Sequence, residues 1–124
     1  MASRVVLVVE DDESICKAIE AALAGQGYLT RTAGTVVDGL GIALTGPVDL
    51  LVLDINLPDG TAWELLERYR QSPGVPPTPV VVISSTRVSR AELRRRGIDR
   101  FVAKPFSMQY LVSVVSELLP SVGP

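Results

Sequence analysis

Three short apolar runs constrain the fold of this chain more than any other feature. They cover residues 5–9, 50–53 and 80–83, and each consists entirely of Val, Leu or Ile. Runs of this length are too short for a typical helix, and their composition is typical of strands buried on both faces of a parallel sheet. We therefore expect three central parallel strands, and two further short strands at about residues 28–32 and at residues 101–103.

Helical patterns separate these strands. Apolar residues recur at helical spacing in four segments, which are residues 13–26, 35–45, 62–71 and 107–119, and a short arginine-rich helix is expected at about residues 89–96, before Gly97. The second segment is a weaker prediction because it contains two glycines, which lower helix propensity. Its pattern places Val36, Val37, Leu40 and Leu44 toward the sheet. Ser107 has the side chain of an N-cap for the last helix.

Five alternations of strand and helix predict an α/β fold. Right-handed crossovers with short loops place helices on both faces of the sheet and give a three-layer (βα)5 sandwich. We expect a doubly wound, flavodoxin-like parallel sheet with strand order 2-1-3-4-5. We also expect residues 1–124 to form a single domain, with a core from about residue 4 to residue 119 and a short tail at 120–124.

The composition excludes several classes of function. The chain has 124 residues, a net charge of −2, no histidine and a single cysteine, Cys16. Histidine-based catalysis and an internal disulfide are therefore ruled out. A direct nucleic-acid partner is disfavoured, because neutralising phosphates requires a basic face. No apolar run approaches the length of a membrane span and the N-terminus lacks a signal-peptide pattern, so we expect a cytoplasmic protein without membrane contact.

Polar side chains follow four of the predicted strands at the point where each strand ends. In chain order these side chains are Glu10, Asp11 and Asp12, then Asp54, then Ser84 and Ser85, and finally Lys104. The carboxyl ends of parallel strands form one crevice, so we expect the carboxylates to converge there. Carboxylates that lie close together favour a hard cation such as Mg²⁺. Asp12 is equally consistent with an N-cap of the first helix.

This set of residues resembles a phosphoryl-transfer site. Such chemistry needs a nucleophile, correct positioning and positive charge at the phosphoryl oxygens. Asp54 is a candidate nucleophile because carboxylates form aspartyl-phosphates. Lys104 supplies a positive charge, and the Ser84 hydroxyl can donate to a phosphoryl oxygen.

From about residue 5 to residue 119 the chain resembles the receiver domain of bacterial two-component response regulators, of the kind that includes the chemotaxis regulators. The motifs that carry the resemblance are Val-Val-Glu-Asp-Asp at 8–12, Asp-Ile-Asn-Leu-Pro-Asp-Gly at 54–60, residues 79–85, and Lys-Pro-Phe at 104–106. The resemblance implies a phosphoacceptor switch rather than a classical enzyme. Its donor would be a histidine kinase or phosphotransfer protein, and its cofactor Mg²⁺ or Mn²⁺.

The resemblance also implies a role for each site residue. Asp54 is the phosphoacceptor, assisted by Lys104 and Ser84. The implied metal ligands are Glu10, Asp11, Asp54 and the backbone carbonyl of Asn56. Ser84 and Phe101 are the implied switch residues, Asn56 and Thr86 the positions that tune dephosphorylation, and Pro105 the candidate for a cis peptide bond.

Two features depart from the family pattern. Lys104 stands twenty positions after Ser84, about two fewer than is usual in the family, so the fourth helix or a flanking loop must be shortened or shifted. The family uses that region, together with the fifth strand and helix, to contact a downstream protein, an output domain or a second copy of itself. Ser85 stands where alanine is more frequent. The arginines between positions 87 and 100 form either a solvated face or a docking site.

Other functions fit the sequence less well. A flavodoxin-like electron carrier needs a hydroxyl- and glycine-rich phosphate loop after the first strand, where this chain has three acids. A haloacid-type phosphatase needs a second acid at position 56, which is Asn. The alternative within the family is a phosphorylation-independent docking module. The sequence leaves the cognate kinase and the output open, and it does not distinguish a stand-alone regulator from a part of a larger one.

Overall fold

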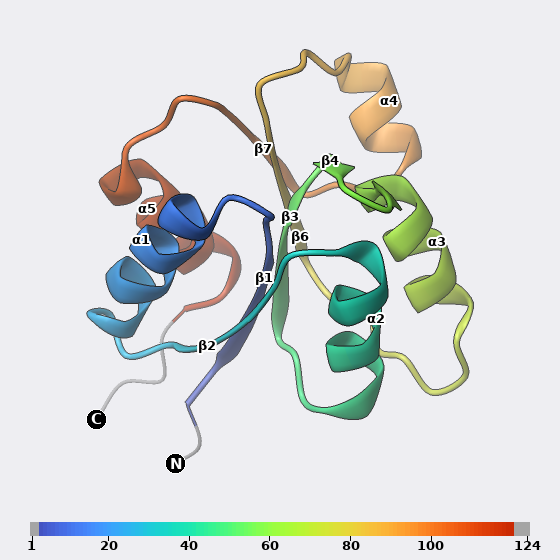
Figure 1. Cartoon of the computed structure of the whole chain (residues 1–124), viewed down its shortest axis with the longest axis horizontal. Helices are drawn as coiled ribbons and strands as arrows, with labels where there is room; N and C mark the ends of the chain where they lie inside the picture. The colour runs from blue at the N-terminus through green and yellow to red at the C-terminus, as the bar shows by residue number, and fades with distance from the viewer. Residues whose placement is uncertain (1–2, 121–124) are drawn as a thin grey trace.

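The computed structural model describes residues 3–120 and contains one five-stranded parallel sheet (Figure 1). The strands of this sheet are β1 (Val5–Val9), β2 (Leu29–Ala33), β3 (Leu50–Asp54), β6 (Val80–Ser84) and β7 (Arg100–Ala103). Their spatial order is β2-β1-β3-β6-β7, and every neighbouring pair is parallel. The predicted fold and the strand order 2-1-3-4-5 are confirmed, since β6 and β7 are the fourth and fifth strands of this sheet.

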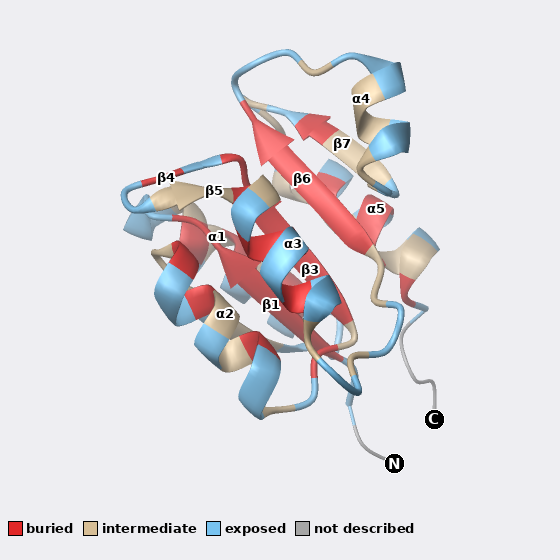
Figure 2. Ribbon diagram, turned by 90° about the vertical axis from the view of Figure 1, so that its right-hand side faces the viewer, coloured by how far each residue is buried: buried red, intermediate tan, exposed pale blue. Residues whose placement is uncertain are grey.

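Helices cover both faces of the sheet, as Figures 1 and 2 show. The helices are α1 (Glu13–Ala24), α2 (Val36–Thr45), α3 (Ala62–Gln71), α4 (Arg90–Arg95) and α5 (Met108–Leu118). One core cluster joins the sheet to α1 and α5, and the other joins it to α2 and α3. The central strands β1, β3 and β6 are buried along their whole length, because both of their faces are covered. None of the described helices is long and apolar enough to cross a bilayer.

A side chain caps the N-terminus of each described helix. The caps are Asp12, Thr35, Thr61, Ser89 and Ser107, and each side-chain oxygen accepts from the backbone N–H three residues later. A cap of this kind contributes about 1 kcal/mol by satisfying one of the free donors of the first turn. The structure therefore assigns Asp12 to capping, through a bond of 3.1 Å from the Ile15 N–H.

The predicted inward face of α2 is wrong in part. Val36 is buried as predicted, but Val37 is 66% exposed and Leu44 is 44% exposed. Gly39 explains the difference, because a Cβ built on it would lie 2.9 Å from Cγ2 of Val9. The helix approaches β1 closely at this glycine, and the face that contains Val36, Gly39 and Ala43 is therefore the buried one.

We predict opposite effects for alanine at the two glycines inside α2. Gly41 is exposed, and a Cβ built on it would have no atom within 4 Å, so Gly41→Ala should raise the free energy of unfolding by about 0.5–1 kcal/mol. Gly39→Ala is the matched control, and it should lower the free energy of unfolding because Val9 and Leu65 must move. Urea denaturation measures both. Equal stabilisation by the two substitutions would contradict the close approach at Gly39.

Candidate functional site

A lysine bridges two carboxylates at the C-terminal edge of the sheet, at the top of the sheet in Figure 1. The Nζ atom of Lys104 lies 2.6 Å from Oε1 of Glu10 and 3.0 Å from Oδ2 of Asp54. Lys104 directly follows β7, Glu10 directly follows β1, and Asp54 is the last residue of β3. The parallel topology therefore brings together groups that are far apart in the sequence. The Glu10 side chain is fully buried and that of Asp54 is 10% exposed.

The donor set at this edge fits a divalent cation. Glu10, Asp11 and Asp54 each offer a carboxylate oxygen, and these oxygens all lie within 4.8 Å of one another. Oε2 of Glu10 is buried and has no hydrogen-bond partner among the described residues. An unpartnered buried carboxylate oxygen is costly, and it is the kind of ligand that a hard cation such as Mg²⁺ binds. Lys104 alone balances only one of the three negative charges.

The electrostatics of the crevice follow from burial. Burial and the neighbouring Asp54 together raise the pKa of Glu10 to about 7, while Lys104 acts in the opposite direction. For Lys104, burial opposes the charged form, but hydrogen bonds to Glu10 and Asp54 outweigh it and raise its pKa. The crevice therefore holds a protonated Lys104, and the single positive charge of this lysine is not enough to keep the pKa of Glu10 at its ordinary value.

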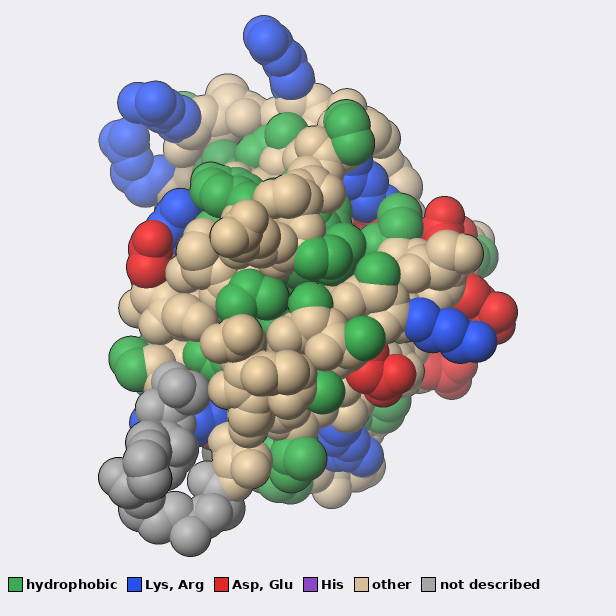
Figure 3. All heavy atoms as spheres, turned by 90° about the vertical axis from the view of Figure 1, so that its left-hand side faces the viewer, with side chains coloured by type: hydrophobic (Ala, Val, Ile, Leu, Met, Phe, Trp, Pro, Cys, Tyr) green, Lys and Arg blue, Asp and Glu red, His purple; other side chains and the backbone are tan. Residues whose placement is uncertain are grey.

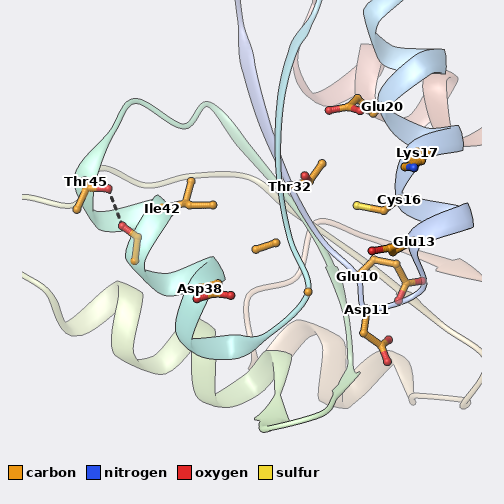
Figure 4. A pocket seen from close by; sticks show the side chains of 13 residues that line it. Glu10, Asp11, Glu13, Cys16, Lys17, Glu20, Thr32, Asp38, Ile42 and Thr45 are labelled. Carbon is orange, nitrogen blue, oxygen red and sulfur yellow. Dashed lines mark hydrogen bonds between the residues drawn. The ribbon is translucent and has the colours of Figure 1, made fainter.

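Glu10 and Asp11 also border a hollow of about 730 Å³ between α1, β2 and α2 (Figure 4). Cys16 and Lys17 of α1 and Asp38 of α2 line it further along. Asp54 and Lys104 do not line this hollow. The candidate site therefore lies at the rim of the hollow, above the strand ends, and not inside it.

Ser84 ends β6 and is 1% exposed. Its hydroxyl accepts a hydrogen bond of 3.0 Å from the Thr86 N–H, and its carbonyl oxygen accepts one of 2.9 Å from the Lys104 N–H. The first bond fixes the start of the loop that leads to α4, and the second fixes the start of the segment that carries the lysine. Ser85 and Thr86 at the start of this loop are exposed.

The remaining predicted residues lie around these groups. Asn56 is exposed and begins β4 (Asn56–Leu57), which pairs with β5 (Gly60–Thr61) in a two-stranded hairpin. Phe101 is half-buried and packs against the core cluster on the α2–α3 face, on the outer strand β7. The Lys104–Pro105 peptide bond is cis.

Sequence reasoning missed the role of Asp59. Its two carboxylate oxygens accept from the N–H groups of Val36 (2.7 Å) and Val37 (3.1 Å), in the first turn of α2. These backbone bonds, that of Val36 above all, lower the pKa of Asp59. The bonds tie the hairpin that follows Asp54 to a different helix. The Pro and Gly that flank Asp59 are typical of a loop and give no sign of this role, since a contact across more than twenty residues leaves no local signal.

The fourth helix is the shortest of the described helices. The helix α4 has six residues, compared with ten to twelve in the other described helices, and none of its residues is buried. Its C-terminal end is held by Arg70 of α3, which donates to the carbonyl oxygens of Arg96 (2.5 Å) and Gly97 (2.9 Å).

The parallel fold and the carboxylate–lysine crevice define a receiver-type signalling domain. The chain matches the model of the response regulator receiver domain over residues 6–116. It is 36% identical over 107 residues to the transcriptional regulatory protein DltR of Streptococcus agalactiae, which covers 86% of this chain and 48% of that protein. The chain therefore belongs to the response regulator receiver domain family, a family of two-component signalling. It spans about half the length of the transcriptional regulators that it matches.

Solved structures agree with this fold. The chemotaxis response regulator CheY4 of Vibrio cholerae superimposes with a TM-score of 0.87 at 24% identity, over 95% of this chain and 100% of that one. The receiver domain of the sensor histidine kinase PA1611 from Pseudomonas aeruginosa, which has a magnesium ion coordinated in its active site cleft, superimposes with a TM-score of 0.82. It is 20% identical over 94% of this chain and 98% of that one.

We predict that Asp59 gives the fold a pH-dependent stability. Because its pKa is lowered in the folded state, its contribution is complete above the unperturbed pKa of 3.8 and is lost as the pH falls through the lower folded pKa. Asp59→Ala should lower Tm at neutral pH, and the difference from wild type should shrink in acid. Asp59→Asn keeps an acceptor oxygen, so its smaller loss should not vary with pH in this range. Thermal unfolding followed by circular dichroism tests this, and a pH-independent deficit in Asp59→Ala would contradict it.

Proposed function

We propose that Asp54 accepts a phosphoryl group from a phosphohistidine of a sensor kinase or phosphotransfer protein. The observation that carries this proposal is the Lys104 ammonium, which contacts both Asp54 and Glu10 at the strand ends. A fixed positive charge beside a carboxylate can stabilise the phosphoryl oxygens without blocking the nucleophile. Membership of the receiver family supports the same reaction class.

In the proposed reaction a carboxylate oxygen of Asp54 forms a bond to phosphorus while the phosphorus–nitrogen bond of the phosphohistidine breaks. The imidazole leaves with the electron pair of that bond, and the product is an aspartyl-phosphate. Lys104 is placed to bind a phosphoryl oxygen, because its Nζ lies 3.0 Å from Oδ2 of Asp54. The chain thus catalyses only its own phosphorylation and dephosphorylation.

Glu10, Asp11, Asp54 and the backbone carbonyl of Asn56 would hold Mg²⁺ or Mn²⁺ in this site. The cation would supply positive charge to the phosphoryl oxygens. The fit rests on the cluster of carboxylate oxygens and on the unpartnered Oε2 of Glu10. The magnesium ion in the PA1611 receiver domain is consistent with this assignment.

The proposed switch begins at Ser84. Its hydroxyl now accepts from the Thr86 N–H, and it would instead donate to a phosphoryl oxygen on Asp54. Phe101, half-buried on the neighbouring strand, is the proposed aromatic partner, and Asn56 and Thr86 would tune dephosphorylation. The result would be a remodelled surface around α4, β7 and α5 that controls a partner or an output domain.

The wider setting is also a proposal. The relatives are transcriptional regulators about twice as long as this chain, which favours a linked output domain or a separate protein target. We propose that residues 1–124 act as one receiver domain in the cytoplasm.

We predict that Asp54→Asn abolishes phosphorylation by acetyl phosphate in the presence of Mg²⁺, because the amide is not a nucleophile. Intact-protein mass spectrometry detects the phosphoryl adduct. Asp12→Asn is the matched control: it stands beside the same crevice but caps α1, a role that asparagine retains, so it should be phosphorylated like wild type. Phosphorylation of the Asp54→Asn chain would contradict the assignment of Asp54 as the phosphoacceptor.

We predict that Lys104→Met separates metal binding from phosphoryl transfer. Removing the ammonium that contacts Glu10 and Asp54 should strengthen Mg²⁺ binding, since a competing positive charge is lost. The phosphorylation rate should fall by at least about tenfold, equivalent to ~1.4 kcal/mol of transition-state stabilisation. Calorimetric titration with Mg²⁺ and the phosphorylation time course measure the two effects. Lys17→Met, at an exposed lysine of α1, should change neither.

A further inference from the structure

Charge is strongly segregated along this chain. Residues 87–100 contain six arginines and two acids, Glu92 and Asp99, which gives the segment a net charge of +4. The whole chain has a net charge of −2, so the remaining residues carry −6. Figure 3 shows the face on the α1 and α5 side, where most of the visible acidic side chains gather along one edge, with basic side chains between them. A basic segment on an acidic domain produces a local field that differs from the net charge.

The two acids of this segment are already engaged. Glu92 pairs with Arg96 at 3.0 Å, and the Asp99 carboxylate accepts from the Val80 N–H at 2.7 Å. Arg100 pairs with Glu117 of α5. The other four arginines, Arg87, Arg90, Arg94 and Arg95, are exposed and form no ion pair within the described residues 3–120.

These four arginines do little for the fold. Arg90 and Arg94 are four residues apart in the same short helix, where like charges repel and destabilise it slightly. The helix α4 contributes no buried residue, and in Figure 2 it shows only exposed and intermediate positions. Arg94 and Arg95 lie in the last turn of α4, where the helix dipole favours a cation, but no ion pair among the described residues offsets the repulsion between the four arginines.

A hollow of about 660 Å³ lies between α3 and α4, and one of these four arginines, Arg95, lines it. Trp63 and Leu66 of α3 line it, and so do Arg95 and Arg96 at the C-terminal end of α4. The guanidinium of Arg96 stacks over the Trp63 ring at 4.4 Å from its centroid. On the α3 side the hollow therefore offers the partly exposed Trp63 ring together with the charged Glu67 and Arg70, and on the α4 side it offers positive charge.

We propose that this α3–α4 surface, made of Arg87, Arg90, Arg94, Arg95 and the hollow that Trp63 lines, docks an acidic amphipathic segment of another protein. Charge complementarity supplies the argument for the acidic partner, and the partly exposed Trp63 ring supplies the apolar contact that an amphipathic segment needs. Nucleic acid fits less well. The basic strip is centred on one six-residue helix, and the net charge of −6 on the remaining residues would repel an extended polyanion.

Trp63 is the sole tryptophan of the chain, so its fluorescence reports directly on this surface. The probe is a capped synthetic peptide of about 15 residues, long enough to form a helix, with glutamate on one face and leucine on the other. We expect a saturable change in Trp63 fluorescence that weakens as salt is added. The Arg94→Glu/Arg95→Glu variant should bind the peptide at least about tenfold more weakly.

The matched control is Arg4→Glu/Lys17→Glu, which changes the net charge by the same amount at exposed positions outside this surface. It should bind like wild type, and circular dichroism should show that both double variants remain folded. If both double variants bound the peptide equally weakly, net charge alone would explain the effect, and the proposal would be overturned. The lack of a saturable change with the acidic peptide, or tighter binding of a short DNA duplex than of the peptide, would also overturn it.

Discussion

The contact of Lys104 with Glu10 and Asp54 is the interaction on which the functional end of this molecule depends. It places one positive charge between two carboxylates, of which Glu10 has a pKa that burial raises. The strand order requires the lysine side chain to span the width of one strand, because β6 lies between β7 and β3. The lysine side chain must therefore cross the end of β6, and the residue that ends this strand, Ser84, is small. The bond from the Lys104 N–H to the Ser84 carbonyl oxygen sets the point from which the side chain starts.

The sheet itself was predictable because its signal is local. Each central strand is an uninterrupted apolar run, and burial on both faces is the only environment in which such a run is stable in a soluble protein. Polar groups just beyond these runs, such as Asp54, could be placed at one edge from the parallel topology alone. Helix starts were predictable for the same reason, as Ser107 shows: an N-cap acts on the turn that directly follows it.

The parts that sequence reasoning missed depend on contacts between distant segments. In α2 the apolar residues occur on more than one side, so the pattern could not reveal that Gly39 is the point of contact with β1. Asp59 looked like a turn residue, yet it caps a helix that precedes it in the chain. The pairing of Lys104 with Glu10, and the oxygen of Glu10 that this leaves without a partner, likewise became visible only with the side chains in place.

The two charge imbalances of the molecule are linked by a short loop. The crevice has an excess of carboxylates, while α4 has an excess of arginines, and residues 85–89 connect Ser84 to the first turn of α4. The C-terminal end of that helix is fixed by Arg70 and Trp63 of α3, whereas its N-terminal end follows the loop. A displacement of Ser84 would break its bond to the Thr86 N–H and act first on the N-terminal end. Since α4 buries no residue, little packing energy opposes such a movement, and the exposed arginines would move with the helix.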